Sequence, residues 1–334
     1  MKVSVCIPTY NQSAYLEQAI QSAAKQSHTP LEIIVADDCS TDDTSALLAK
    51  LAAEIPYLKV IRQRQNVGIM GNTDACLRHA SGDFIVRLDS DDYLSPNYIE
   101  KLGQQLLKFP KAGYAHAAVQ EIDHAGAFLQ HRKLFRKSGS QASNEALRSM
   151  LKGYRVAANI IMFKREALVT VNYVSGRPTQ VEDYSLASAI CAAGYDNIYL
   201  DETLAFYRVW ETTGHARRKR KLTEITGLQR VFEEVLEPAY HQRGWEIKDV
   251  LASKTQLACK HANCLAWDIY DETEKKELLA ALQKLSSTSP AQLVYWLYLN
   301  GLGKPINIVS NVEATCKAYL KGSQVLWPLV RYNK

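Results

Sequence analysis

Short apolar runs alternate with helix-like segments over the first two hundred residues of the chain. The predicted strands are residues 3–7, 32–36, 58–61 and 83–88, and the predicted helices are residues 14–26, the residues that follow 40–43, and residues 71–80. Strands that alternate with helices of this length form a mostly parallel sheet with helices on both faces. The pattern therefore predicts an α/β fold, in which function is carried by the loops that follow the strands.

The later residues follow a different pattern. Residues 112–119 and 156–163 are strand candidates, and residues 128–145 form a polar excursion between them. Beyond about residue 215 the predicted helices are residues 222–236, 250–270, 274–285 and 291–299, with Pro238, Pro290, Pro305 and Pro328 as helix breakers. We expect an α/β domain over residues 1–215 and a helical C-terminal region over residues 216–334.

Composition indicates an ordinary soluble globular protein of 334 residues, 47% of them hydrophobic and 22% charged. The seven cysteines are scattered without a CxxC pair, which argues against a zinc site or a disulfide framework. The N-terminus lacks the charged start and long apolar core of a signal peptide, and the longest apolar run, residues 293–299, is too short to span a membrane. These features predict a reduced, cytoplasmic protein.

The net charge of +5 is mild, but part of it is concentrated in the basic run of residues 217–221. Such a run is usually a solvated helix start, and it could also meet an anionic membrane surface or phosphates, or bind nucleic acid. Aromatic residues that would stack on bases are not interleaved with it, so no nucleic-acid partner is expected.

Three carboxylates, Asp89, Asp91 and Asp92, lie within four positions directly after the fourth predicted strand. Open α/β sheets bind ligands at the carboxyl ends of their strands. Three neighbouring anions repel one another, which favours a Mg²⁺ or Mn²⁺ ion that also carries phosphate oxygens of a substrate. In the alternative reading, the acids belong to a turn before the next helix, because Ser95 and Pro96 resemble an N-cap and a first helical residue.

Two other strand-end loops carry candidate ligand-binding residues. Pro8 and Tyr10 follow the first strand, where a simple strand terminator is the competing interpretation. Asp38 and the acid before it follow the second strand and need hydrogen-bond donors, such as a base N–H or a ribose hydroxyl. Helix capping would also explain these acids, but Ser40 or Thr41 can supply the cap, which leaves Asp38 for a ligand.

The loop after the third strand contains Asn66, Gly68, Gly71 and Asn72. Two glycines and two amides suit a backbone that a ligand approaches closely. The loop lacks the GxGxxG and GxxxxGK[ST] motifs, which argues against a dinucleotide-binding fold and against a P-loop.

A fifth segment begins at Glu182 and Asp183, directly before the helical spacing of Leu186, Ile190 and Ala193. Two acids at a helix start are favourable with the helix dipole and need no function. Alternatively, a carboxylate beside another carboxylate has a raised pKa and can accept a proton from a hydroxyl as a general base. From the residues alone, both interpretations stay open.

Together, these five segments resemble the family 2 glycosyltransferases in order and spacing. The pieces that carry the resemblance are residues 3–11, 32–42, 66–72, 82–92 and 182–183, and the match covers roughly the first 210 residues. The resemblance implies the GT-A fold, a Rossmann-like, mostly parallel central sheet with helices on both faces, here followed by the helical C-terminal region.

The resemblance also implies roles for single residues. Pro8, Tyr10 and Asp38 would hold the nucleotide base and ribose, and Asn66 and Asn72 would line the donor pocket. Asp89-Ser90-Asp91 would be the DxD motif, in which Asp89 faces the nucleotide-sugar, Asp91 ligates Mg²⁺ or Mn²⁺, and Asp92 is a weaker substrate-binding candidate. Asp183 matches the base of the family's Glu-Asp motif, with Glu182 beside it. Many members carry a His shortly after a Tyr-Arg pair, and whether His215 or Arg208 contacts the diphosphate stays open.

The implied activity is a metal-dependent, inverting transfer of one sugar from a nucleotide-sugar, expected to be UDP-linked, to a hydroxyl of a glycan or lipid-linked acceptor. The QxxRW motif of processive synthases is absent from the sequence, which favours single-sugar addition in the assembly of a bacterial surface polysaccharide such as an O-antigen. The alternatives are a catalytically silent nucleotide-sugar-binding protein of the same fold, and a nucleotidyltransferase, which would need a glycine-rich basic loop after the first strand.

The helical C-terminal region suggests peripheral association with an anionic membrane surface at the inner face of the cell membrane. Its basic run and its aromatic residues Tyr295, Trp296, Tyr298 and Trp327 could rest on lipid. In the alternative reading, these aromatic residues form the core of a helical subdomain.

Overall fold

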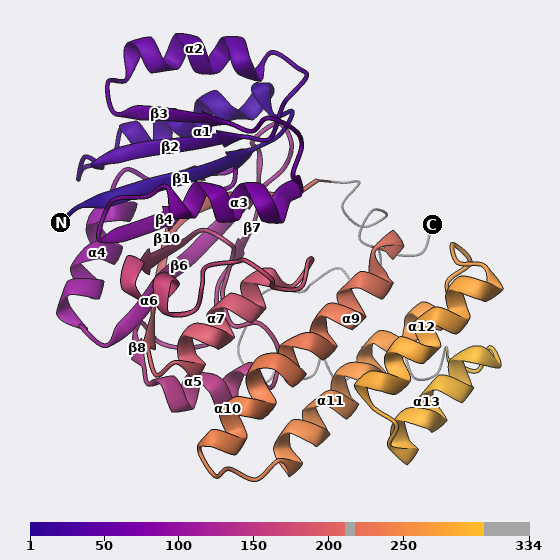
Figure 1. Cartoon of the computed structure of the whole chain (residues 1–334). Coiled ribbons are helices and arrows are strands. Elements are labelled where there is room, and N and C mark those ends of the chain that lie inside the picture. The colour runs from indigo at the N-terminus through magenta and orange to yellow at the C-terminus, as the bar shows by residue number, and fades with distance from the viewer. Residues whose placement is uncertain (211–217, 304–334) are drawn as a thin grey trace. The chain divides into compact units, whose positions relative to one another are not determined.

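A computed structural model of the protein describes residues 1–210 and 218–303 (Figure 1). Its strands are β1 Val3–Thr9, β2 Glu32–Asp37, β3 Leu58–Arg62, β4 Phe84–Arg87, β5 Tyr93–Leu94, β6 Ala112–Ile122, β7 Phe128–Arg132, β8 Gly139–Gln141, β9 Ile161–Lys164 and β10 Asp196–Arg208. They form one sheet in the order β3-β2-β1-β4-β9-β6-β10-β5, in which β7 also pairs with β6 and β8 with β10. The first four strands of this order are parallel, β9 is antiparallel to both neighbours, and β10 is parallel to β6.

Helices separate the strands and then continue alone. They are α1 Ser13–Ala24, α2 Thr44–Glu54, α3 Gly68–Arg78, α4 Tyr98–Lys108, α5 Ser143–Met150, α6 Arg165–Thr170, α7 Glu182–Ala192, α9 Lys221–Val231, α10 Glu237–Gln242, α11 Lys248–His261, α12 Glu272–Leu285 and α13 Ser289–Leu299, with a π-helix, η1 Phe232–Leu236, and a 3₁₀-helix, η2 Ala262–Ala266. The predicted α/β architecture with a helical C-terminal region is confirmed.

Both faces of the parallel half of the sheet are covered by helices. Successive side chains of a strand point to opposite faces. On β1, Val5 and Ile7 are fully buried in one hydrophobic cluster with Leu16 of α1. Between them, Cys6 points the other way, and its Sγ lies 3.5 Å from the carbonyl oxygen of Cys76 in α3. An unbroken apolar run such as that of β1 is therefore explained by burial on two faces.

The sequence patterns were least reliable between residues 110 and 208. The 13-residue strand β10 was not predicted, β7 and β8 lie in the predicted polar excursion, and the predicted strand 156–163 is replaced by β9, which begins only at Ile161. The centre of β10 is exposed at residues 201–203, and its register against β6 shifts between Leu200 and Thr203. This irregularity interrupts the alternation on which strand prediction depends.

Two helix starts differ from those read from the sequence, one from the alternative reading of Ser95 and Pro96 and one from the predicted helix 71–80. Helix α4 begins at Tyr98 and not at Pro96, because both the backbone N–H and the hydroxyl of Ser95 donate to the carbonyl of Leu204 in β10. Helix α3 begins at Gly68, three residues before the predicted start, so most of the glycine-containing loop is helical.

The chain divides into two compact units. The first comprises the described part of Met1–Arg217 together with Arg230–Val250, and the second comprises Arg218–Gln229 and the described residues from Leu251 onward. The predicted boundary at residue 215 lies outside the described residues. Neither Pro238 nor Pro290 ends a helix. Pro290 lies in the first turn of α13, where a missing N–H has no cost, and Pro238 lies in α10 directly after the π-helix η1, in a helical run that continues from α9. Pro305 and Pro328 lie outside the described residues.

The helical unit has its own core. Tyr295 is 1% exposed and its hydroxyl donates to the carbonyls of Leu282 and Ser286, and Tyr298 is 5% exposed. The interpretation of these two tyrosines as membrane-facing was therefore wrong. Trp296 of the same helix is 53% exposed, and Trp327 lies outside the described residues.

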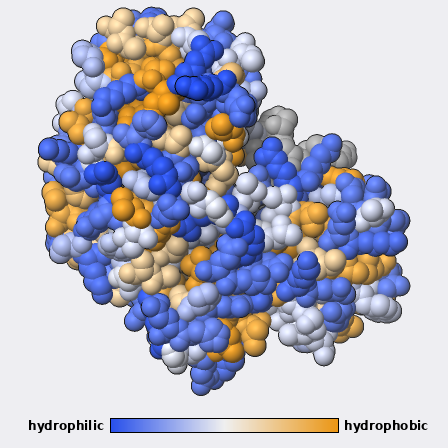
Figure 2. All heavy atoms as spheres, in the orientation of Figure 1, coloured by the Kyte–Doolittle hydropathy of each residue, from blue (hydrophilic) through white to orange (hydrophobic). Residues whose placement is uncertain are grey.

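None of the helices within residues 1–210 and 218–303 combines the length and the hydropathy that crossing a bilayer requires. On the face shown in Figure 2, hydrophobic residues form small patches that hydrophilic residues separate.

Candidate active site

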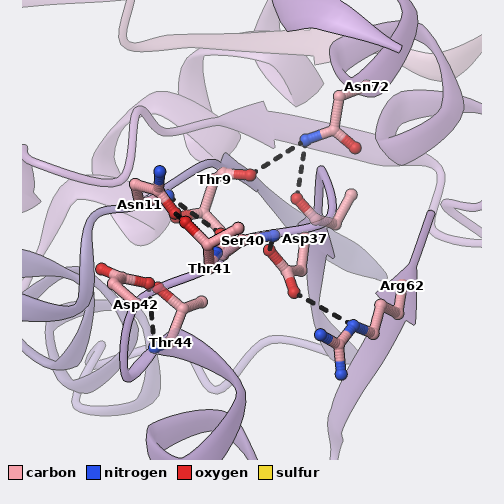
Figure 3. A network of polar contacts seen from close by, with 10 residues as sticks. Thr9, Asn11, Asp37, Ser40, Thr41, Asp42, Thr44, Arg62 and Asn72 are labelled. Atoms are coloured by element: carbon pink, nitrogen blue, oxygen red, sulfur yellow. Dashed lines mark hydrogen bonds and ion pairs between the residues drawn. The ribbon is translucent and has the colours of Figure 1, made fainter. Parts of the chain in front are cut away.

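The loops after β1 and β2 are joined by hydrogen bonds between their residues (Figure 3). Asn11 has a positive φ of 51°, a conformation that asparagine tolerates better than most residues. Its backbone N–H donates to Ser40 Oγ at 2.9 Å, and its Oδ1 accepts from the N–H of Thr41 at 2.8 Å. These two loops therefore form one rigid rim at the carboxyl edge of the sheet.

The cap of α2 differs from the prediction, which assigned it to Ser40 or Thr41. The N-cap position is Asp43, whose side chain makes no capping hydrogen bond. The residue before it, Asp42, accepts from the N–H of Thr44 through Oδ1 and from the N–H of Ser13 at the start of α1 through Oδ2, both at 3.1 Å. One carboxylate thus satisfies N–H groups at the starts of two helices.

Asp37 and Asp38 are both buried, and their carboxylates point to different partners. Asp37 Oδ1 accepts from the N–H of Ser40 at 3.0 Å, and its Oδ2 lies 3.7 Å from Nε of Arg62. Asp38 Oδ1 accepts from the N–H of Val67 at 2.8 Å, which connects this loop to the start of α3. Asp38 keeps its second oxygen without a hydrogen bond among the described residues.

Of the two predicted donor-pocket amides, Asn72 is 2% exposed and Asn66 is exposed. Asn72 Nδ2 donates to the carbonyls of Thr9 and Ala36 at 3.3 and 2.7 Å, and its Oδ1 accepts from Gln63. Figure 3 shows this side chain bridging the ends of β1 and β2. Both polar ends of Asn72 are therefore used inside the protein, so that its contribution to a donor pocket would be to hold these strand ends.

The remaining strand-end residues are accessible. Pro8 is half-buried at the end of β1, Tyr10 is 47% exposed, and Asn66 uses its Oδ1 to accept from the N–H of Gly68 at 3.1 Å. Because β1, β2 and β4 are parallel neighbours, their carboxyl ends lie at one edge of the sheet. Asp89, Asp91 and Asp92, which we call the acidic cluster, therefore begin at the same edge of the sheet that carries Tyr10 and Asp38.

The acidic cluster follows β4 directly, and its three carboxylates have different surroundings. Asp91 Oδ2 accepts from Nε1 of Trp210 at 2.8 Å. Burial raises the pKa of Asp91, the indole hydrogen bond counteracts part of this effect, and the Asp89 carboxylate raises the pKa further. Asp92 is 2% exposed, and burial together with Asp91 and Asp89 holds its pKa well above the usual range. The cluster therefore concentrates negative charge that its neighbours do not fully offset.

Arg208 anchors the other side of the cluster. Its backbone N–H donates to Asp92 Oδ1 at 2.7 Å, and its Nε donates to the carbonyl oxygen of Asp91 at 2.9 Å. The guanidinium lies 4.5 Å from the centre of the Tyr15 ring and is 4% exposed as a residue. Arg208 therefore holds the loop of the acidic cluster in place, while His215, the other candidate for the diphosphate, lies outside the described residues.

Glu182 and Asp183 begin α7, as predicted, and Arg87 connects them to the acidic cluster. Arg87 is the last residue of β4 and is 2% exposed. Its Nη1 forms an ion pair with Asp183 Oδ1, and its Nη2 lies 3.4 Å from Asp89 Oδ1 and 4.0 Å from Glu182 Oε1. The acids near position 90 and the acids near position 182 therefore face one buried guanidinium.

Sequence reasoning overlooked Arg87. The signal that could have indicated it is a charged side chain inside the otherwise apolar run 84–88, where a buried charge requires a partner. The sequence does not name that partner, because Asp183 is distant along the chain.

The environment of Asp183 suits proton transfer near neutral pH. Burial raises the pKa of Asp183 to about 7, although Arg87 lowers it, and the Glu182 and Asp89 carboxylates raise it further. A general base is most effective when its pKa lies near the working pH.

The residues present fit a divalent cation that phosphate oxygens share. Within residues 1–210 and 218–303, no group of three or more His, Cys, Asp or Glu side chains is arranged as a metal site. Mg²⁺ and similar ions need only one or two protein carboxylates when substrate phosphates complete their coordination. Asp91, beside two further carboxylates and with a raised pKa, offers such a ligand, since a cation would relieve the repulsion within the cluster.

This sheet, with its parallel half and its acidic strand end, has the architecture of the GT-A fold. The family model for glycosyl transferase family 2 matches residues 4–170, which is half of the chain. The chain belongs to glycosyl transferase family 2, so the predicted family and fold class are confirmed.

Two relatives indicate the range of the family. The chain is 34% identical to the chondroitin synthase of Escherichia coli over 129 residues, 39% of this chain and 19% of the relative. It is 39% identical to the GalNAc(5)-diNAcBac-PP-undecaprenol beta-1,3-glucosyltransferase of Campylobacter jejuni over 116 residues, 34% of this chain and 36% of the relative. The matches thus span about a fifth and about a third of these relatives' lengths.

Solved structures share the fold over most of the chain. Staphylococcus aureus TarS 1-349 in complex with UDP aligns with a TM-score of 0.56 at 18% identity, covering 90% of this chain and 92% of that one. The mannosyltransferase PcManGT from Pyrobaculum calidifontis, in complex with GDP-Man and Mn²⁺, aligns with a TM-score of 0.55 at 21% identity, covering 98% and 87%.

Proposed function

We propose that the chain transfers one sugar, with inversion, from a UDP-sugar to a hydroxyl of a glycan or of a lipid-linked acceptor. The observation that carries this proposal is the shared guanidinium of Arg87, which brings the candidate base Asp183 and the donor-side Asp89 together. Inverting transfer needs a base close to the donor-binding residues, because the acceptor oxygen must be deprotonated as it attacks the anomeric carbon from the face opposite the leaving group.

The donor end of the site is assigned to the rim formed by the strand-end loops. Pro8 and Tyr10 would contact the base, and Asp38 would accept a hydrogen bond from the base or the ribose through the oxygen that Val67 leaves open. Asn66 and Asn72 would hold the loops on which this pocket depends. The complex of TarS with UDP supports a uridine nucleotide, whereas that of PcManGT with GDP-Man makes guanine the alternative to test.

Asp91 would ligate Mg²⁺ or Mn²⁺, with Asp89 and Asp92 nearby on the substrate side. When bound, the cation would neutralise the diphosphate as negative charge develops on it. The Mn²⁺ complex of PcManGT supports this assignment for the fold. Trp210 and Arg208 would fix the Asp91 carboxylate and its backbone.

The transfer step assigned to Asp183 balances as a single displacement. Asp183 takes the proton of the acceptor hydroxyl as that oxygen forms a bond to the anomeric carbon. The bond between the anomeric carbon and the phosphate oxygen breaks, and the electron pair leaves with the nucleoside diphosphate. A raised pKa supports this role, because a carboxylate near its pKa can accept a proton at neutral pH.

The acceptor is assigned to bacterial surface polysaccharide assembly, such as an O-antigen, where glycans are extended on lipid carriers. The name of the Campylobacter jejuni relative, which includes an undecaprenol-linked glycan, supports this class. Exposed Lys219 and Arg220, and the exposed side chains of Leu293 and Trp296, support contact between the helical unit and an anionic membrane at the inner face of the cell membrane. Absence of co-sedimentation with anionic vesicles at low salt would contradict that contact.

A thermal-shift screen tests the donor assignment. A bound nucleotide stabilises the folded state by mass action, about 2.7 kcal/mol at a hundredfold excess over Kd. We expect stabilisation by UDP with Mn²⁺ that is lost in EDTA and in Asp91→Ala. Asp83→Ala serves as the matched control, because this exposed carboxylate precedes the same strand at its other end and should leave the shift unchanged.

A second variant separates binding from transfer. Asp183→Asn should keep the Mn²⁺-dependent UDP shift and reduce transfer by roughly 10²- to 10⁴-fold, the usual contribution of a general base. Native transfer rates in Asp183→Asn would refute the base assignment. Donor binding by the native protein without any transfer or hydrolysis would instead indicate a catalytically silent nucleotide-sugar-binding protein.

A further inference from the structure

We propose that Arg87 is a positioning residue, which holds the Asp183 carboxylate ready for proton abstraction and connects it to Asp89 on the donor side. This inference rests on the proposed function and extends it to a residue that contacts neither donor nor acceptor. It assigns to one side chain the coupling between the two halves of the site.

The geometry of the guanidinium supports this role. Arg87 ends β4, Asp89 lies two residues farther along, and Asp183 lies in the first turn of α7. Nη1 pairs with Asp183 Oδ1, and Nη2 faces Asp89 Oδ1 at 3.4 Å and Glu182 Oε1 at 4.0 Å. A single planar group therefore sets the distance between the strand end and the helix start.

Arginine suits this position better than lysine would. The guanidinium presents several N–H donors in a fixed fork, whereas an ammonium is a point charge on a flexible stem. In Arg87, the two terminal nitrogens serve carboxylates in different elements, and Nε is buried without a partner among the described residues. Arg87 is 2% exposed, and its two terminal nitrogens point in two fixed directions, so the ion pair restricts how the Asp183 side chain can rotate.

Charge gives a second argument. The groups that face Asp183 are Arg87 from β4, Asp89 from the following loop, Glu182 from α7 and the phenol of Tyr154. Arg87 is the one cation among them. Burial raises the pKa of Asp183, and Arg87 opposes that rise, while Glu182 and Asp89 add to it. Without Arg87, Asp183 would carry its proton at neutral pH and could not accept another.

The test compares the pH dependence of kcat in native protein, Arg87→Met and Arg87→Lys. The assay measures release of the nucleoside diphosphate from the nucleotide-sugar that gives the largest Mn²⁺-dependent thermal shift. We expect Arg87→Met to lower kcat at pH 7 by about 100-fold and to move the acid limb of the profile upward by about one pH unit or more. KM for the donor should change less than threefold. Arg87→Lys should restore the position of the limb and only part of kcat.

Arg177→Met is the control for loss of a partly buried arginine that contacts α7. Arg177 donates to the carbonyl and hydroxyl of Ser185 in α7, and it contacts none of the site carboxylates. It should lower Tm without moving the acid limb. A limb that stays in place in Arg87→Met, or that moves equally in Arg177→Met, would overturn the inference.

A double-mutant cycle in Tm tests the pairing without substrate. Arg87→Met should be strongly destabilising, because it leaves the buried carboxylates of Glu182 and Asp183, and the partly buried carboxylate of Asp89, without their cation. Adding Asp183→Asn should recover part of that loss, so that the double variant melts above Arg87→Met. If the Tm losses of Arg87→Met and Asp183→Asn simply added in the double variant, the pairing of Arg87 with Asp183 would be contradicted, and this result does not depend on an activity assay. If the native protein fails to bind or turn over nucleotide-sugars, the proposed function is wrong, and this cycle still decides whether Arg87 holds Asp183.

Discussion

The indole Nε1 of Trp210 donates a 2.8 Å hydrogen bond to Oδ2 of Asp91. The indole ring is itself held in place by Tyr15, whose ring it meets edge to face at 5.2 Å between centroids. The residue that the sequence assigns to metal binding is therefore oriented by a side chain from beyond the end of β10. Partners that orient a ligand are important for metal affinity, because they fix the direction of its lone pairs.

Trp210→Phe should weaken Mn²⁺ binding. Phenylalanine keeps the edge-to-face packing on Tyr15 and removes the hydrogen bond to Asp91. We expect the Mn²⁺ concentration for half-maximal stabilisation by UDP to rise by about tenfold, as measured by thermal shift. Trp245 packs edge to face on Tyr240 and does not reach the acidic cluster, so Trp245→Phe is the control and should leave this concentration unchanged. Equal Mn²⁺ dependence in Trp210→Phe and native protein would show that the indole does not support the metal ligand.

Asp183→Asn should change the pH dependence of stability. The pKa of Asp183 is raised to about 7 in the folded state, above its unfolded value of about 4, so the folded state binds this proton more tightly. Its contribution to stability therefore falls as pH rises between those two values. The Tm of Asp183→Asn relative to native protein should increase from pH 4.5 to pH 8. A difference that stays flat over this range would contradict the raised pKa.

Glu32 should also make the stability of the protein depend on pH, but its contribution should rise with pH, whereas that of Asp183 falls. It accepts hydrogen bonds from Ser4 Oγ, Lys59 Nζ and both donors of Ser81. Although burial raises the pKa of Glu32, these hydrogen bonds lower it to about 2. Its stabilisation is present above the unfolded pKa and is lost as pH falls toward 2.

Glu32→Gln should therefore cost about 2 kcal/mol at pH 7 and clearly less at pH 3, as measured by urea unfolding. Glu54→Gln, an exposed residue at the end of α2, is the control and should have little effect at either pH. An equal loss at both pH values would mean that the charge of Glu32 is not what the network uses.

Gly82→Ala should destabilise the protein by about 1–3 kcal/mol. A Cβ at this position would lie 2.8 Å from the backbone N of Ser4 and from its Oγ, and the backbone has little freedom to move between β1 and β4. Gly71→Ala is a milder control, because the nearest atoms, at 3.2 Å, belong to the Val67 side chain. Unfolding in urea should separate the two variants, and equal stability would contradict the steric argument.

Local patterns predicted the parallel half of the sheet well. Strands β1 and β2 are buried on two faces, so each reads as an unbroken apolar run, before Pro8 and before Asp37. The helix between them shows the spacing of one buried face. Predictions failed where a distant partner decided the outcome. Ser95 donates to the carbonyl of Leu204 in β10 and does not cap α4. The centre of β10 is exposed, so its residues lack the alternating pattern from which a long strand would be predicted.

The sequence by itself determined the fold class, the family and the residue types available at the strand ends, because hydrophobic periodicity and motif spacing are local properties. Only the tertiary structure decided which charges meet. Arg87 lies between Asp89 and Asp183, and Trp210 lies on Asp91, through contacts between segments far apart along the chain. A buried charge requires a partner, but the local sequence does not say which one. Here the start of α7 lies within reach of the Arg87 side chain at the end of β4, and that placement makes the choice.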